Sequence, residues 1–124
     1  MIYRVKKNYQ FSFIYRKGRS FANGLLVMYV VRNKNNVRNA ETFSKIGVSV
    51  SKKVGNSVVR SRSKRLINES FRLNYNNISK GYDFVFIARN SIKMKKYSDV
   101  EKAMISLLKK AGLYKNEENI IESN

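Results

Sequence analysis

The stretch SVSKKVGNSVVRSRSKRLI, residues 49–67, decides how this 124-residue chain folds. It begins at the end of residues 43–51, where apolar and polar residues alternate in the manner of a half-buried strand. The inward face of that strand would carry Ile46, Val48 and Val50, and the outward face Lys45, Gly47 and Ser49. A glycine-containing turn follows, after which Asn56 or Ser57 can cap a helix that extends to about Asn74. The stretch therefore predicts a strand that leads directly into a long helix.

The predicted helix has an apolar side and a basic side. With about 100° between successive residues, the side that packs on the sheet carries Val59, Ser63, Leu66, Ile67, Ser70 and Leu73. The other side and its two boundaries carry Arg60, Ser61, Arg62, Lys64, Arg65, Asn68 and Arg72. Most runs of charged residues on a helix simply face solvent, but such faces normally mix basic and acidic residues that pair at helical spacing. On this helix Glu69 is the only acidic residue available for such a pair. Lys52 and Lys53 precede the helix N-terminus, whose backbone N–H groups already favour anions. This face therefore predicts phosphate binding, since Arg can grip a phosphate through two N–H groups.

Five further segments complete the predicted order of elements. They are a helix over Asn8–Lys17, a strand over residues 20–31, a polar loop over 32–42, a strand over 82–89 and a helix over 97–111. The first helix has one apolar face, made of Phe11, Ile14 and Tyr15. We expect Gly18 to end that helix, Asn23 and Gly24 to interrupt the strand, and Ser98 to cap the last helix. The sequence thus predicts a small single α+β domain of order αβββαβα, with a central sheet packed by helices.

The composition predicts a polyanionic partner. There are 26 Lys and Arg against 8 Asp and Glu, a formal net charge of +18, and no acid precedes Glu41. Self-repulsion of that size burdens the compact state, so nucleic acid is the leading partner and an anionic membrane surface is second. The 43% of hydrophobic residues is enough for a modest core.

The residues that are absent exclude several kinds of site. Without Cys or His, the chain cannot form disulfides, zinc-thiolate sites or a His general base. Its carboxylates are too sparse to predict a protein metal site or protein catalytic residues. The N-terminus lacks the apolar stretch of a secretory signal, and no run of about 18 apolar residues predicts a membrane span. A cytoplasmic location fits these features.

Aromatic residues interleave with basic residues in the acid-free front of the chain. They are Phe11, Phe13, Tyr15, Phe21 and Tyr29. Core packing explains at least two of these rings, whereas a stacking platform for single-stranded bases in a basic groove would explain the others. Tyr15 and Tyr29 are the favoured stacking residues, because a phenol tolerates a half-buried, wet position.

Residues 49–67 resemble the signature of the bacterial ribonuclease P protein component, in which a strand ending in SVSKK is followed by xGNAVxRNRxKRxIRE. Three more segments are similar to this family: KKNYQFSFIYRKGRSFAN at 6–23, YDFVFIAR at 82–89 and SLLKKAGLYK at 106–115. The chain departs from the family pattern at Ser61, where Asn is usual, and at Asn68, where a basic residue is usual.

The resemblance implies a left-handed βαβ crossover, where strand spacing alone predicts the usual right-handed one. It also implies that an RNA subunit carries out the Mg²⁺-dependent removal of the 5′ leader from precursor tRNA and holds most of the Mg²⁺. No membrane and no protein partner would be required, and the domain would cover residues 1–115, before a polar tail at 116–124. By position, the residues that bind the RNA subunit would be Lys52, Lys53, Asn56, Arg60, Arg62, Lys64 and Arg65. The leader-binding cleft would be lined by Phe11, Tyr15, Tyr29 and Tyr114.

Three other classes of function are weighed against this one. A structural RNA-binding protein of the ribosomal type explains the charge but not the groove aromatics. A protein nuclease requires converging acids, and here Glu69 is isolated and Asp83 lies in a strand. A membrane-surface protein is the weakest reading, since the charge is spread over an apparently globular fold.

Overall fold

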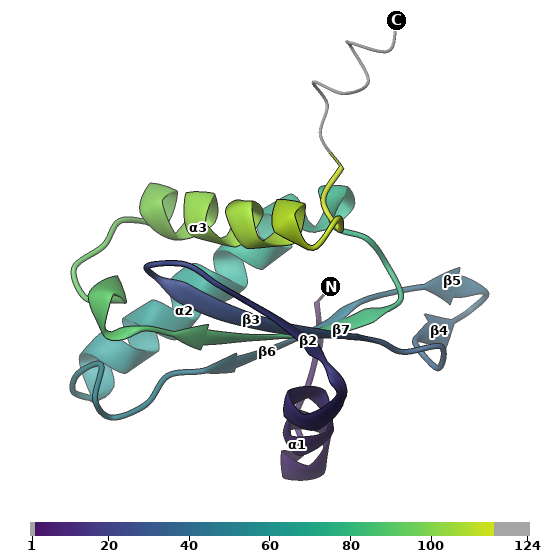
Figure 1. Cartoon of the computed structure of the whole chain (residues 1–124), viewed down its shortest axis with the longest axis horizontal. Helices are drawn as coiled ribbons and strands as arrows, with labels where there is room; N and C mark the ends of the chain where they lie inside the picture. The colour runs from purple at the N-terminus through teal and green to yellow at the C-terminus, as the bar shows by residue number, and fades with distance from the viewer. Residues whose placement is uncertain (1, 116–124) are drawn as a thin grey trace, which may run out of the picture.

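The computed structural model describes residues 2–115, which form a five-stranded mixed sheet with helices on both faces (Figure 1). The sheet contains β1 (Tyr3–Arg4), β2 (Arg19–Ala22), β3 (Leu26–Arg32), β6 (Lys45–Ser49) and β7 (Tyr82–Ala88), in the spatial order β1-β6-β7-β3-β2. The helices are α1 (Asn8–Lys17), α2 (Ser57–Asn74) and α3 (Tyr97–Lys110). The predicted α+β class is confirmed, and the predicted tail at 116–124 lies outside the described residues. No helix in the described range is long and apolar enough to span a bilayer.

The centre of the fold is the parallel pair β6 and β7, which α2 connects. Their register runs from Lys45 opposite Asp83 to Ser49 opposite Ile87. Parallel neighbours cannot be joined by a tight turn, so the chain needs a crossover element, and α2 supplies it. The predicted helix between two strands is confirmed, whereas the left-handedness of the crossover stays a prediction.

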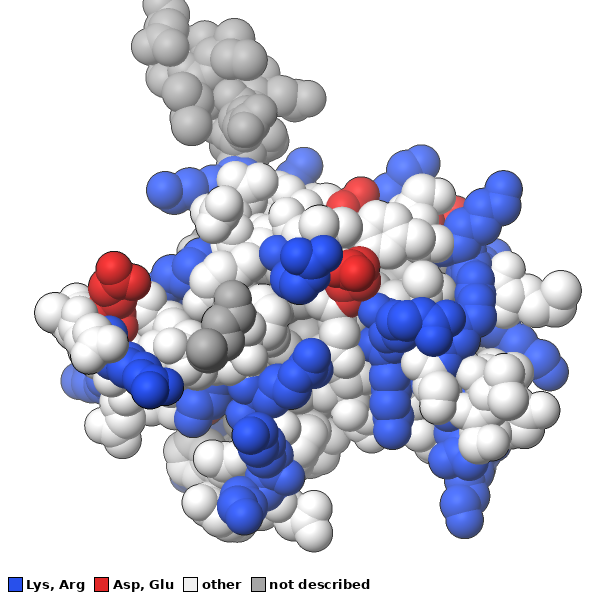
Figure 2. All heavy atoms as spheres, turned by 180° about the vertical axis from the view of Figure 1, so that it is seen from behind, with Lys and Arg blue, Asp and Glu red and all other residues white. Residues whose placement is uncertain are grey.

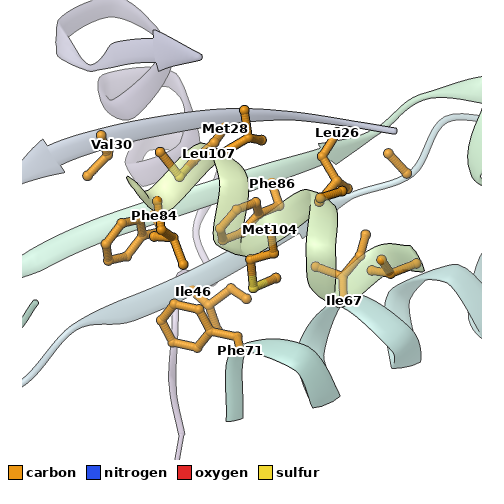
Figure 3. Packing of buried hydrophobic residues seen from close by; sticks show 14 of the residues in the cluster. Leu26, Met28, Val30, Ile46, Ile67, Phe71, Phe84, Phe86, Met104 and Leu107 are labelled. Carbon is orange, nitrogen blue, oxygen red and sulfur yellow. The ribbon is translucent and has the colours of Figure 1, made fainter. Parts of the chain in front are cut away.

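Helices cover the two sheet faces unequally. Figure 1 shows α1 on one face and α2 with α3 on the other. The larger core lies beneath α2 and α3, where the ring of Phe71 meets Phe84 and Phe86 edge-on at centroid distances of 5.7 and 6.3 Å (Figure 3). A smaller cluster beneath α1 contains Val5, Ile14 and Val85. Strand β7 is therefore covered on both faces, which explains why its sequence is almost continuously apolar.

The interruption of residues 20–31 predicted at Asn23 and Gly24 is confirmed, but it is a chain reversal between two strands rather than the expected bulge or kink. Chain reversal occurs at Asn23, whose side-chain oxygen accepts hydrogen bonds from the backbone N–H groups of Leu25 and Leu26, at 3.1 and 3.0 Å. The resulting β2–β3 pair is antiparallel. An Asn side chain that bonds its own backbone two residues onward favours a turn over a bulge. The predicted polar loop over 32–42 likewise contains a small hairpin, β4 (Val37–Arg38) and β5 (Glu41–Thr42).

Three predicted side-chain positions also require correction. Gly47 was expected to face outward but is buried, because α1 covers that face of β6. Leu73 was expected to face the sheet, yet it is 57% exposed, and Phe71 is buried in its place. Ser98 does not cap α3. The N-cap is Lys96, and the carboxylate of Asp99 accepts its backbone N–H at 3.1 Å.

We predict that Gly47→Ala destabilises the fold. A Cβ at this position would lie 2.8 Å from a ring carbon of Phe11 and 3.0 Å from Cβ of Val5, so α1 would have to move away from the sheet. We expect a loss of about 1–3 kcal/mol in the free energy of unfolding, measured by urea denaturation. Gly24→Ala is the matched control, since a Cβ there meets no described atom within 4 Å. Equal stability of the two variants would contradict the close packing of α1.

Candidate nucleic-acid interface

The basic face begins at the turn before α2 and continues along the helix. Lys52 and Lys53 are exposed in the turn, and Lys64 and Arg65 are exposed on α2. Figure 2, seen from behind, shows Lys and Arg side chains spread widely over the surface, with acidic side chains at separate points. Among the described residues the only ion pair is Arg72 with Glu69. The other basic groups of this face therefore make no ion pair within residues 2–115 that would compete with a polyanion.

Asn56 fixes where α2 begins. Its side-chain oxygen accepts a hydrogen bond from the backbone N–H of Val59 at 3.0 Å, which is the geometry of an N-cap. The oxygen is thus used within the protein, while the side-chain amide nitrogen is left to donate outward. Asn56 therefore fixes the start of α2 directly after the turn that carries Lys52 and Lys53.

Arg60 and Arg62 are more restrained than the sequence suggests. Arg62 donates to the backbone oxygen of Lys95 at 2.8 Å, so it holds the loop before α3 against α2. Arg60 is half-buried, and within residues 2–115 its Nε atom is enclosed with no hydrogen-bond partner. The Arg62 side chain is thus held by a hydrogen bond and the Arg60 side chain by the atoms that enclose it. The loop attached to Arg62 contributes three more exposed lysines, Lys93, Lys95 and Lys96.

Arg4 joins the basic face, although sequence reasoning missed it. Its guanidinium donates to the side-chain oxygen of Asn68 at 2.7 Å, and both residues line a depression with Arg65 and Arg72. The family pattern that the sequence resembles has a basic residue at the position of Asn68. Arg4, which lies in β1, supplies a positive charge at that point of α2. Because the two residues are 64 positions apart, no local pattern could have identified this pair.

Three of the four predicted cleft aromatics come together between α1 and the sheet. The ring centroids of Phe11 and Tyr15 are 6.3 Å apart, and those of Tyr15 and Tyr29 are 5.1 Å apart at 76°, an edge-to-face contact. Phe11 lies directly over Gly47, whose missing side chain makes the approach possible. Tyr15 is 38% exposed and Tyr29 is partly exposed, so this aromatic cluster offers ring surface to a ligand.

Burial raises the pKa of the Tyr15 phenol, and the Ser49 hydroxyl offsets part of that rise. A phenol with a raised pKa is neutral at physiological pH. It therefore offers a stacking ring without repelling phosphates.

The remaining aromatics are placed elsewhere. Phe13 is 45% exposed outside the Phe11–Tyr15–Tyr29 cluster, and Phe21 is half-buried beneath the guanidinium of Arg19 at 4.9 Å. Tyr114 is not brought to the cleft, since its hydroxyl donates to Asn74 of α2 at 3.1 Å and its ring faces Lys109 of α3. A role for Tyr114 in leader binding stays a prediction.

Strand β6 connects the cleft to the basic face. Ser49, beside Tyr15, is the last residue of β6, and Lys52 follows three positions later in the exposed turn. The aromatic cluster and the start of the basic face therefore lie at the same end of β6.

The carboxylates do not fit a magnesium site of the protein's own. In the described part of the chain, no three acidic side chains are grouped as metal ligands. Glu69 pairs with Arg72, and the buried carboxylate of Asp83 accepts hydrogen bonds from Asn33 and Asn36. Hard cations require several converging oxygen ligands, and this arrangement does not supply them.

Fold and surface together define a small basic α+β protein of the nucleic-acid-binding class, with a cationic helix face beside an aromatic cleft. A family model described as Ribonuclease P matches residues 2–112. The ribonuclease P protein component of Clostridium beijerinckii is 67% identical over 119 residues, 95% of each chain. That of Clostridium botulinum (strain Eklund 17B) is 63% identical, and the match covers both chains completely.

Solved structures agree with these sequence matches. The Staphylococcus aureus RNase P protein superposes with a TM-score of 0.80 at 36% identity, covering 92% of this chain and 99% of that one. The Thermotoga maritima RNase P protein gives a TM-score of 0.76 at 28% identity, covering 86% and 96%. The chain belongs to the family of bacterial ribonuclease P protein components. It is thus the protein part of an endoribonuclease ribonucleoprotein that matures tRNA 5′ ends, and the family implies ribonuclease P RNA as its partner.

We predict that Asn56 contributes to stability through its cap. Asn56→Ala should lower the free energy of unfolding by about 0.5–2 kcal/mol, whereas Asn56→Ser, which keeps an oxygen for the Val59 N–H, should stay close to the parent protein. Urea denaturation with both variants measures the difference. If the Ser and Ala variants were destabilised equally, the capping role would be wrong.

Proposed function

We propose that this protein binds the ribonuclease P RNA subunit through the α2 basic face and holds the single-stranded 5′ leader of precursor tRNA in the Phe11–Tyr15–Tyr29 cleft. In this way it promotes the Mg²⁺-dependent endonucleolytic removal of the leader. The single observation that carries the proposal is the placement of three aromatic rings beside, but apart from, a cationic helix that begins at the cleft's rim.

The basic face suits a structured RNA because its charges are held on rigid elements. Lys64 and Arg65 project from α2, the N-cap fixes the preceding turn, and Arg4 extends the face onto β1. Neutralising several phosphates releases counterions and gives strong, salt-dependent binding without reading bases. Mg²⁺ would be held by RNA phosphates, because the carboxylates within residues 2–115 do not converge.

The cleft suits single-stranded rather than paired RNA. Bases stack on aromatic rings only when they are unpaired, and stacking tolerates sequence variation, as a leader that differs between tRNA precursors requires. Fixing the leader beside the RNA active site would position the scissile phosphate, and positioning accounts for large rate effects in catalysis. Neither a protein partner nor a membrane enters this proposal, which is compatible with the predicted cytoplasmic location.

We predict that Arg65→Ala weakens binding to the RNA subunit and reduces the salt dependence by about one phosphate contact. Titration of the RNA with the protein at several salt concentrations gives both quantities. Lys110→Ala, which removes an equally exposed charge from α3, is the matched control. Identical salt slopes for the two variants would remove Arg65 from the interface.

We predict that Tyr29→Ala costs roughly 1–3 kcal/mol of affinity for leader-bearing precursor tRNA in the reconstituted holoenzyme, because one base loses its stacking ring. Affinity for mature tRNA and for the RNA subunit should not change. Tyr29→Phe keeps the ring and should bind as the parent protein does, and thermal unfolding of each variant controls for stability. Should the parent holoenzyme bind precursor and mature tRNA equally, the proposed leader cleft would be wrong.

A further inference from the structure

Helix α1 separates two grooves, and the proposed function uses only one of them. The second groove, here called the outer groove, has a volume of about 650 Å³. It is lined by residues from α1, the end of β3, the loop after it and the start of β7, including Tyr9, Phe13, Arg16, Asn33, Lys34 and Asp83. At about 100° per residue, Tyr9 and Phe13 lie on the side of α1 turned away from Phe11 and Tyr15. The outer groove and the leader cleft are therefore distinct surfaces.

The walls of the outer groove combine exposed rings with positive charge. Tyr9 is 72% exposed and Phe13 is 45% exposed, and the Arg16 guanidinium lies 5.8 Å from the centroid of the Phe13 ring. Arg32 and Lys34 are exposed at the opposite rim. Rings that can stack on a base, within a rim that attracts phosphate, form the combination by which proteins bind single-stranded nucleic acid.

The groove also contains a buried carboxylate. Asp83 is only 8% exposed, and its oxygens accept hydrogen bonds from the side-chain amides of Asn33 and Asn36, at 2.9 and 2.8 Å. It has no ion-pair partner, since the one ion pair within residues 2–115 is Arg72 with Glu69. Burying a carboxylate without a cation is costly. Each oxygen retains a further lone pair for a donor that enters the groove.

We propose that the outer groove is a second nucleobase-binding site, which takes an unpaired RNA base bearing an exocyclic amino group. The base stacks on Phe13 or Tyr9, its amino group donates to Asp83, and its phosphate meets the cationic rim. Adenine, cytosine and guanine present such an amino group, whereas the one ring donor of uracil, its N3–H, lies between two carbonyl oxygens that a carboxylate repels. A basic peptide is disfavoured by Arg16, Arg32 and Lys34, and an acidic peptide by Asp83. The site goes beyond leader binding, since it needs no ligand in the leader cleft.

NMR titration of the ¹⁵N-labelled full-length protein tests this site, with AMP, CMP, UMP and inorganic phosphate as probes at constant ionic strength. AMP and CMP should shift the side-chain amide signals of Asn33 and Asn36, and UMP should bind at least about fivefold more weakly. Equal shifts with all four probes would show anion binding alone and overturn the proposal. The absence of any shift at these amides would also overturn it.

Matched variants separate this proposal from the leader cleft. Phe13→Ala should weaken AMP binding roughly fivefold or more, whereas Leu73→Ala, which removes a similarly exposed apolar side chain from α2, should not. Asp83→Asn should bring AMP and UMP to similar affinity, with thermal unfolding as the check on folding. If Tyr29→Ala abolished the shifts at Asn33 and Asn36, there would be one site and the outer groove would be rejected. The opposite result is also possible: the parent protein could show the Asn33 and Asn36 shifts with AMP while its holoenzyme binds precursor and mature tRNA equally. That result would reject the leader cleft and leave the outer groove standing.

Discussion

The parallel pairing of β6 with β7 is the constraint on which the rest of the molecule depends. Because both strands run the same way, the chain that leaves β6 at Ser49 must return to the opposite end of the sheet before it can enter β7 at Tyr82. An 18-residue helix spans about 27 Å, enough for that return. The start of α2 is therefore fixed at the carboxyl end of β6, beside the rings of the proposed leader site. The adjacency of the basic face and the aromatic rings follows from strand direction.

Charge is tolerated because the fold keeps it at the surface. The chain carries a net charge of +18, yet no Lys or Arg is buried among residues 2–115, and the buried acid Asp83 is bonded by two amides. Self-repulsion of the remaining basic groups lowers stability without RNA, and a bound polyanion removes that cost. The distribution of charge that favours RNA binding is thus also one that makes the complex more stable than the free protein.

Local features could be predicted from the sequence, and features that join distant segments could not. The helical period of residues 57–74, the cap at Asn56 (one of the two predicted candidates) and the α+β class rest on local patterns, and the structure confirms them, whereas the short strand β1 before α1 was not predicted. The alternation of apolar and polar residues in β6 predicts that Gly47 faces solvent. That prediction is wrong because α1 covers this face of the sheet. The contact of Arg4 with Asn68 and the separation of Tyr114 from the cleft depend on tertiary packing. The motif that resembles the family predicts candidate site residues, but it could not show that Arg62 bonds to the Lys95 carbonyl.

The two sides of α1 offer different kinds of recognition, because the sheet beneath them differs. On the side proposed to bind the leader, Phe11 and Tyr29 pack against an apolar cluster with Val85, so a base there would gain stacking but few hydrogen bonds. Stacking alone discriminates weakly among bases, which suits a site that must accept many leaders. On the outer side, the sheet ends in Asp83 and Asn33, which can accept or donate at a base edge. A buried polar group rejects a ligand that leaves it unpaired, so any selectivity for base identity should arise in the outer groove.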